Sequence, residues 1–280
     1  MKTSHAISRL IIISLFSLLI IACKDKEKVT TPEINIFGFN DYEAAKRALG
    51  KYIQIEETTE GSLLIDVIKT NDMVDVDVYA RFNDTPLSDR SFGGDYFIGD
   101  IPLKYYSEGF YSIEDYESMT EQQLLNLVEP YFGNEVSFRL ERDGQVQFKD
   151  SFYLPGRLKI SNLKVMDPYN IFIPVSRNNL KIEWNADLKN ENGVVAYIVW
   201  TGNKATSLPS VQYGYEETGV SFADNGSTIL PKESLAKIPK DAQFTIFFIR
   251  GNISLPPAKD GRRYKVYMLS QEKYSFQMID

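Results

Sequence analysis

The feature that most limits what this chain can fold into is a series of short apolar runs with the two-residue period of a β-strand. In the clearest run, Val74, Val76 and Val78 alternate with Asp75 and Asp77, which predicts a strand with one buried and one solvated face. Further candidate strands lie at residues 63–68, 135–152, 158–166, 171–175, 180–184, 194–200, 244–249 and 264–278. Short strands separated by Gly, Pro and Asn predict a mostly β protein built from sandwiches.

Residues 135–152 are expected to form a hairpin whose turn follows from the register of its strands. A two-residue loop would place Leu140 opposite Gln147, so that the apolar faces of the two strands would disagree. A three-residue loop at 142–144 instead pairs Leu140 with Val146. This register predicts a bulge with Gly144 in the left-handed conformation.

Two short helices are expected in the first half of the chain. Asn40 can cap a helix that ends at Gly50. Ser118 and Glu121 have the spacing of a capping box, and the helix that they open has to end by Pro130.

A break in the strand pattern at residues 154–156 (Leu-Pro-Gly) divides the expected strands into two domains. Residues 34–154 are predicted to form a β-rich domain with the two helices, and residues 155–280 an immunoglobulin-like β-sandwich. The chain is 43% hydrophobic and 25% charged, which is the composition of a globular protein. The 258 residues from Cys23 to Asp280 are enough for one large or two ordinary domains.

The second half also resembles a known group of domains. The stretches Ile160–Leu163, Leu180–Asn185, Asn190–Val195 and Ile198–Gly202 are similar to the immunoglobulin-like domains of Bacteroidota outer-membrane lipoproteins. This half lacks the paired cysteines of antibody domains, so the resemblance implies a shared architecture. It carries over no catalytic residue.

The N-terminus has the three regions of a secretory signal. Lys2 and Arg9 give the segment a positive start and are followed by an apolar run from Leu10 to Ile21. This run is too short to cross a bilayer as a helix. The residues before Cys23 resemble the lipobox of bacterial lipoproteins. That resemblance implies a signal peptide at 1–22, lipid attachment at Cys23 and a tether at 23–33. It also implies that the chain is anchored in the cell envelope at the outer membrane, on its periplasmic or external side. The alternatives are an ordinary cleaved signal with an incidental cysteine and a membrane-anchored start.

The content of histidine and cysteine excludes several kinds of catalytic site. His5 is the only histidine and Cys23 the only cysteine, so the processed chain cannot build a Ser-His-Asp centre, a Cys-His centre or a His/Cys zinc site. Loss of Lys2 and Arg9 changes the formal net charge from −7 to −9, which argues against nucleic acid. No cofactor, metal or catalytic residue is expected, and carboxylate chemistry is what remains.

The carboxylates and amides of the sequence allow two interpretations. Asn185, Asp187, Asn190 and Asn192 precede Gly193 and could supply oxygens to calcium, but their spacing departs from an EF-hand and favours a turn. The acids at 72, 75 and 77, like those at 56, 57 and 60, are interpreted as solvated surface.

Two stretches expected to be loops, residues 91–99 and 104–111, concentrate aromatic residues beside glycines. Exposed rings could stack on sugars or anchor a protein partner, whereas buried rings would fill the core, which is the plainer interpretation. The candidate ligand-binding residues are Phe92, Tyr96, Phe97, Tyr105, Tyr106, Phe110 and Tyr111.

Together these features predict a membrane-anchored, non-catalytic lipoprotein that acts as a binding or scaffold module for a protein partner or a polysaccharide. Two other classes stay open: a carboxylate-dependent enzyme acting on glycans, and an accessory subunit of an outer-membrane uptake or secretion complex. Substitution of one acid would abolish activity in the first case, and crosslinking would identify the complex in the second.

Overall fold

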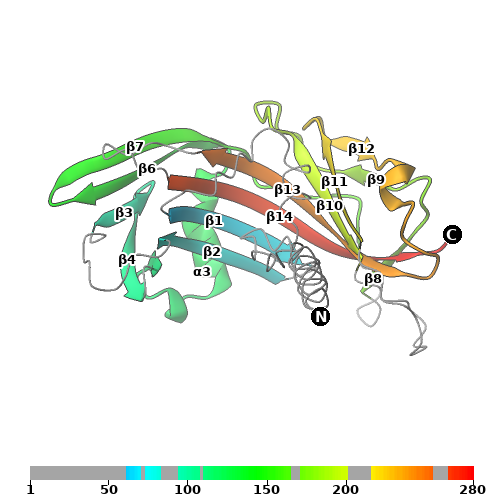
Figure 1. The fold of residues 1–280 in the computed structure, drawn as a ribbon, viewed down its shortest axis with the longest axis horizontal. Coiled ribbons are helices and arrows are strands. Elements are labelled where there is room, and N and C mark those ends of the chain that lie inside the picture. The colour runs from blue at the N-terminus through cyan, green and yellow to red at the C-terminus, as the bar shows by residue number, and fades with distance from the viewer. Residues whose placement is uncertain are drawn as a thin grey trace, which may run out of the picture. The chain divides into compact units, whose positions relative to one another are not determined.

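The computed structural model describes residues 61–70, 73–82, 94–107, 110–164, 171–200, 216–254 and 264–280. Cys23, the tether and the helix expected at residues 40–50 lie outside these ranges. Within them the chain is mostly β, as predicted, with a single α-helix (Figure 1). The helical elements are η3 (Tyr116–Ser118), α3 (Glu121–Val128), η4 (Glu129–Tyr131) and η5 (Lys232–Leu235), where η denotes a 3-10 helix.

Most of the described strands belong to one large sheet. They are β1 (Gly61–Thr70), β2 (Met73–Phe82), β3 (Asp95–Ile98), β4 (Ile101–Ser107), β5 (Phe110–Ile113), β6 (Asn134–Arg142), β7 (Gln145–Leu154), β8 (Phe172–Val175), β10 (Val194–Trp200), β11 (Glu216–Phe222), β13 (Gln243–Ser254) and β14 (Tyr264–Met278). Their order is β11-β10-β13-β14-β1-β2-β5-β4-β3-β6-β7, with β8 also paired to β14. A second, two-stranded sheet contains β9 (Lys181–Glu183) and β12 (Ser227–Ile229).

The long strands β13 and β14 hold the large sheet together. They pair antiparallel over the whole of β13, from Gln243 opposite Gln277 to Ser254 opposite Val266. The first ten residues of β14 also pair in parallel with β1, and its last four pair in parallel with β8. Because β14 takes a different neighbour at each end, one continuous sheet joins the two halves of the sequence (Figure 1).

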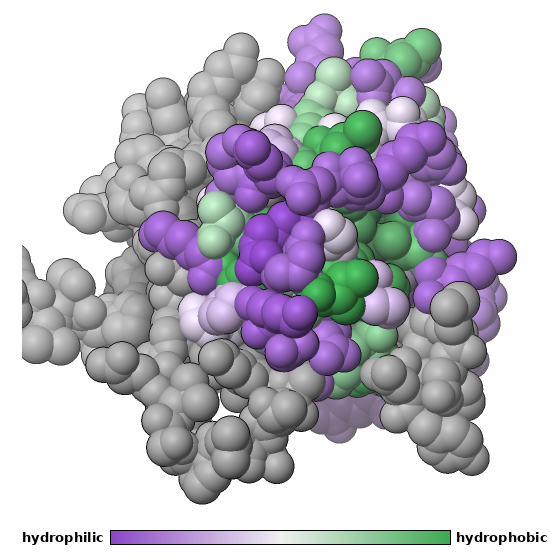
Figure 2. Space-filling view, turned by 90° about the vertical axis from the view of Figure 1, so that its right-hand side faces the viewer, coloured by the Kyte–Doolittle hydropathy of each residue, from purple (hydrophilic) through white to green (hydrophobic). Residues whose placement is uncertain are grey.

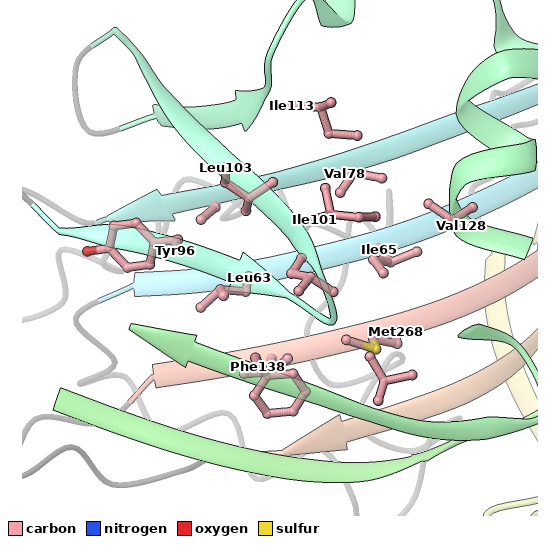
Figure 3. Close-up of a cluster of buried hydrophobic side chains, with 14 of the residues drawn as sticks. Leu63, Ile65, Val78, Tyr96, Ile101, Leu103, Ile113, Val128, Phe138 and Met268 are labelled. Atoms are coloured by element: carbon pink, nitrogen blue, oxygen red, sulfur yellow. The ribbon is translucent and has the colours of Figure 1, made fainter. Parts of the chain in front are cut away.

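A first hydrophobic cluster fills the space between this sheet and α3. Alternate residues of β1 and β2, including Leu63, Ile65 and Val78, point into it and are fully buried. Figure 3 shows these side chains converging with Phe138 from β6 and Met268 from β14. The period-two pattern that predicted β2 therefore identifies its buried face correctly.

A second hydrophobic cluster is formed by residues between 158 and 278. Ile182 and Trp184 contribute to it from β9 and the position after it, and Phe244, Ile246 and Phe276 contribute from β13 and β14. Residues 194–198 of β10 are all buried, as expected for a strand with an apolar run that is covered on both faces.

Two polar residues of β14 separate the clusters. Val266 and Met268 belong to the first cluster, and Tyr274 and Phe276 to the second. Between them lie Ser270 and Glu272, both buried; the Ser270 hydroxyl accepts the backbone N–H of residue 158 at 3.0 Å, and a Glu272 oxygen accepts that of residue 160 at 3.0 Å. The segment that follows β7 is therefore hydrogen-bonded across the middle of the sheet.

The helix α3 begins and ends close to the predicted positions, with a different cap. Thr120 is the N-cap, and its side chain and that of Gln123 form the reciprocal hydrogen bonds of a capping box, two residues beyond the pair expected from the sequence. The helix ends at Val128, before Pro130, whose ring is accommodated in η4.

The β6–β7 hairpin solves its register problem differently from the prediction. Its loop has two residues, Asp143 and Gly144, with φ angles of 53° and 70°. The left-handed conformation predicted for Gly144 is confirmed, and the expected three-residue loop is wrong. A bulge follows within β7, where Leu140 pairs with Phe148 while the next pair is Glu141 with Val146. The extra residue shifts β7 by one position, so that Phe148 lies on the buried face and Val146 is exposed.

Other local expectations are corrected or stay open. No strand is formed at residues 158–164, where Ile160 makes an isolated bridge to Trp184 instead. The described chain has one continuous sheet and two clusters that share β14. The division into residues 34–154 and 155–280, and the immunoglobulin-like type of the second part, stay predictions.

Candidate functional site

The predicted ligand-binding aromatic residues fall into three environments. Tyr105 and Tyr106 on β4 are 61% and 57% exposed, whereas Tyr96 and Tyr111 are buried in the first hydrophobic cluster. Phe97 and Phe110 are half-buried, and Phe92 lies outside the described residues. The structure brings Tyr105, Tyr106, Phe110 and Tyr111 together at the β4–β5 hairpin, and we define the two exposed rings with Phe110 as the hairpin aromatic surface.

An irregularity in the hairpin explains why two consecutive tyrosines reach solvent. Tyr105 pairs with Tyr111, and Ser107 pairs with Phe110, so that Tyr106 is an extra residue on β4. Neighbouring residues of β5 point to opposite faces of the sheet. The ring of Tyr105 contacts Tyr111 on the buried-cluster side, and that of Tyr106 contacts Phe110, which points to the other side.

Each exposed ring is supported by a row of aromatic contacts. The centroids of Tyr105 and Tyr111 are 5.5 Å apart at 77°, and Tyr111 meets Tyr96 at 4.6 Å and 64°. Such edge-to-face pairs contribute about 0.5–1.5 kcal/mol beyond the area that they bury. The exposed ring of Tyr105 is therefore held against a buried support.

Tyr106 has the corresponding support on the other side of the hairpin. Its ring centroid lies 6.0 Å from that of Phe110 at 79°, and Phe110 lies 5.1 Å from Tyr79 of β2. Its hydroxyl donates to Glu117 on η3. The hydrogen bond and the negative charge of Glu117 raise the pKa of the Tyr106 hydroxyl, so this group stays a neutral donor.

The element that carries Glu117 is attached to the edge of β2. The hydroxyl of Tyr116, the neighbouring residue, donates to the Val76 carbonyl at 3.1 Å, and a Glu121 oxygen at the start of α3 accepts the Val76 N–H at 3.0 Å. These bonds satisfy a stretch of β2 beyond its pairing with β5. The contributions of Glu117 and Tyr79 were missed by the sequence analysis, because nothing in their spacing links them to residues 105 and 106.

Phe97 belongs to a different contact. The guanidinium of Arg139 lies over its ring, 3.8 Å from the centroid, and Glu141 accepts the Arg139 Nε–H at 2.7 Å. Ring, cation and carboxylate are already combined there within the chain. Phe97 is thus occupied by an internal partner, whereas Tyr105 and Tyr106 expose most of their rings.

The acids of β1 and β2 do not form an exposed pair. Asp66 is 3% exposed and lies opposite Asp77 in the β1–β2 register, and its Oδ2 accepts from Gln271 at 2.6 Å. Burial, followed by the charge of Asp77, raises the pKa of Asp66 to about 8. Asp75 is exposed, and within the described ranges no group of three or more His, Cys, Asp or Glu residues is placed to hold a metal ion.

The amide-rich stretch before β10 forms a loop with internal hydrogen bonds, in keeping with the turn interpretation. Asn190 is buried, and its Nδ2 donates to the Gly193 carbonyl at 2.7 Å and to Asp224 at 2.8 Å. Asp187 accepts the Tyr153 hydroxyl at 2.8 Å. These oxygens and amides serve the packing of the loop against β7 and β13.

On the side of the molecule that faces right in Figure 1, the described surface is mixed. Figure 2 shows small hydrophobic areas there, separated by hydrophilic residues. Among the described residues of the second half, the exposed large hydrophobic residues are Ile171, Leu188, Ile229 and Ile279. Scattered apolar residues of this kind are normal on a soluble surface, so the hairpin aromatic surface is the better candidate.

In comparisons with known proteins, no protein-family model and no curated protein matches the chain. Among the described residues, none of the helices has the length and apolar character needed to cross a membrane.

Proposed function

We propose that this chain is a lipid-anchored, non-catalytic binding module of the outer membrane, and that the hairpin aromatic surface contacts its partner. The anchor is proposed from the signal and from Cys23 in the sequence. The absence of His and of a second Cys from the chain after residue 23 supports a role without nucleophilic catalysis. Two sandwich domains, the second of immunoglobulin type, form the proposed scaffold.

The observation that carries the binding role is the exposure of Tyr105 and Tyr106. Most of each ring faces solvent although neighbouring rings are buried, and tyrosine is enriched where protein surfaces are recognised. Both rings are held by edge-to-face contacts, and Tyr106 also by its bond to Glu117. Prior immobilisation lowers the entropic cost of binding.

Photo-crosslinking in the native cells tests the binding role. A benzophenone amino acid at position 105 or 106 is expected to give a discrete adduct with one partner. The matched control is position 188, where Leu188 is 86% exposed on a loop of the second half. Equal labelling from position 188, or no adduct from either tyrosine position, would contradict the proposed role.

The anchor is tested independently of the binding surface. Cells fed a tagged fatty acid are expected to label the wild-type chain and to leave the Cys23→Ala variant unlabelled. The same variant should leave the membrane fraction, because several acyl chains are what give durable anchoring. Label on both chains would refute lipidation at Cys23 without bearing on the tyrosines.

A further inference from the structure

The sequence around the hairpin aromatic surface has an uneven charge. The 34 residues from Tyr105 to Phe138 contain seven Asp or Glu and no Lys, Arg or His. The basic residues at neighbouring backbone positions are Lys104, which precedes Tyr105, and Arg81, which pairs with Phe110. The exposed tyrosines therefore lie in an acidic part of the chain.

Three of these acids are exposed on the segment that follows β5, and one of them contacts Tyr106. Glu114, Asp115 and Glu117 follow β5 directly and are all exposed, and Glu117 binds the Tyr106 hydroxyl. Within the described ranges, none of the three forms an ion pair with a Lys or Arg of the chain. Their charges are available to an external partner.

Further acids lie near Tyr116, the residue before Glu117, and they add to the effect of burial on its pKa. Partial burial, followed by the charges of Asp77, Glu121 and Asp75, raises the pKa of Tyr116 to about 12. Burial and the charge of Asp75 also raise the pKa of Asp77. A ligand with phosphate, sulfate or uronic acid groups would be repelled here, because like charges brought together at an interface cost affinity.

The same chain shows how a ring and a carboxylate hold a cation. At Phe97, the Arg139 guanidinium lies over the ring, and its Nε–H donates to Glu141. Tyr106 and Glu117 offer the same two groups, an aromatic face and a carboxylate, at an exposed position. A lysine or arginine side chain gains from both groups, whereas a neutral sugar gains from the ring face alone.

We propose that the hairpin aromatic surface binds a cationic polypeptide segment that reaches both sides of the β4–β5 hairpin. Its Lys or Arg side chains meet Tyr106 and the carboxylate of Glu117 on one side and Tyr105 on the other, and the carboxylates at 114 and 115 add to the attraction. This inference rests on the proposed function and specifies the class of partner. Association is steered by charge and weakens with salt, because exposed charges are screened over about 8–10 Å at physiological ionic strength.

The test uses three fluorescent probes on the purified chain: an arginine–glycine repeat peptide, a glutamate–glycine repeat peptide and cellohexaose. Charge is removed with little change of shape by the triple variant Glu114→Gln, Asp115→Asn, Glu117→Gln. Asn tolerates the left-handed backbone of Asp115, whose φ is 61°. Gln keeps an acceptor for Tyr106.

The matched control removes three exposed charges elsewhere: Glu191→Gln, Glu233→Gln and Asp241→Asn. All three residues are exposed, and Asp241 has a left-handed φ of 62° like Asp115. The control and the test variant therefore have the same net charge, and each places one Asn at a position with a left-handed backbone conformation.

The arginine peptide is expected to bind the wild-type chain, and the glutamate peptide is not. The site variant should weaken this binding about tenfold at low salt, since each exposed ion pair supplies about 0.2–1 kcal/mol. Tyr105→Ala with Tyr106→Ala should weaken it at low and high salt alike, and the control triple variant should bind as the wild type does.

Three results would overturn the inference. They are equal weakening by the control triple variant, binding of cellohexaose in place of the arginine peptide, and no binding of any probe. If the crosslink from position 106 forms in cells while one of these results is obtained, the proposed binding role stands and the cationic partner is wrong. If no crosslink forms and no probe binds, both fall.

Discussion

Removing the charge of the buried Asp224 should test which interactions stabilise the second half of the chain. Asp224 is 5% exposed and accepts four hydrogen bonds. Its Oδ1 accepts from the Trp184 indole at 2.8 Å and from Arg250 at 2.6 Å, and its Oδ2 accepts from Asn190 at 2.8 Å. Arg250 in turn donates to the Gly156 carbonyl at 3.0 Å, which joins β13 to the segment after β7.

The variant Asp224→Asn keeps the shape of the side chain and removes its charge. The guanidinium of Arg250, whose side chain is fully buried, then lacks its counter-ion, and one amide group opposes the Asn190 amide. Breaking a buried pair in this way costs about 3–5 kcal/mol. A single domain is typically stable by about 5–15 kcal/mol, so the loss should be large.

A double-mutant cycle separates the ion pair from the other contacts. Arg250→Met removes the opposite charge and keeps much of the apolar length. The double variant should be more stable than the sum of the single losses predicts, by about 2 kcal/mol or more, because it leaves no unpaired buried charge.

Urea unfolding followed by tryptophan fluorescence measures these free energies, with Trp184 as a probe inside the network. The control is Glu183→Gln, which breaks the exposed Lys181–Glu183 pair and should cost less than about 1 kcal/mol. A loss below about 1 kcal/mol for Asp224→Asn, or additive single losses, would refute the assignment of a stabilising buried pair.

Three further predictions concern the pH dependence, the backbone and the crossover after β7. The pKa of Asp66 is raised in the folded chain to about 8 from an unfolded value of about 3.9. The folded state therefore binds the proton more tightly, and stability falls as pH rises between these values. Asp66→Asn should flatten this part of the dependence of the thermal unfolding midpoint on pH, and an unchanged slope would contradict the prediction. Gly193→Ala places a Cβ 2.0 Å from a backbone carbonyl oxygen at a φ of 77°, whereas Gly144→Ala at a φ of 70° meets no atom within 4 Å. In denaturation experiments, Gly193→Ala should therefore lower the free energy of unfolding by clearly more than the roughly 1–2 kcal/mol expected for Gly144→Ala. Equal losses would be inconsistent with the close approach at Gly193. Ser270→Ala leaves the Leu158 N–H without its buried acceptor. This should lower the free energy of unfolding by about 1–3 kcal/mol and speed the exchange of that amide with deuterium. Unchanged protection of the amide would count against this role of the hydroxyl.

Local sequence patterns predicted the type and the buried face of several elements. The alternation of Val76 and Val78 with Asp75 and Asp77 identified β2, and the apolar run at 194–200 identified a covered strand. The period of side-chain burial in a strand is a local property, so short stretches of sequence suffice to reveal it. The hairpin shows the limit, because the position of one extra residue decides whether Val146 or Phe148 lies opposite Leu140 on the buried face.

The candidate site was partly visible in the sequence. The concentration of rings near residues 105 and 111 was recognised, but composition cannot tell that Tyr105 is exposed while its cross-strand partner Tyr111 is buried. That difference depends on which strands flank β4 and β5 and on the extra residue at Tyr106. The supporting roles of Tyr79 and Glu117 arise from contacts made across other elements.

By itself, the sequence determined that the chain is mostly β, which face of β2 is buried, and that the chain after Cys23 lacks imidazole and thiol. The strands β3, β4, β5, β11 and β12 were not among those it predicted. Only the tertiary structure decided that β14 lies beside both β1 and β8, that Glu272 reaches Lys69 across 203 positions of sequence, and that two adjacent tyrosines stay in water. The physical reason is range: dihedral preference and side-chain alternation act between near neighbours, whereas strand pairing is chosen among distant segments by the burial that the assembled sheet allows.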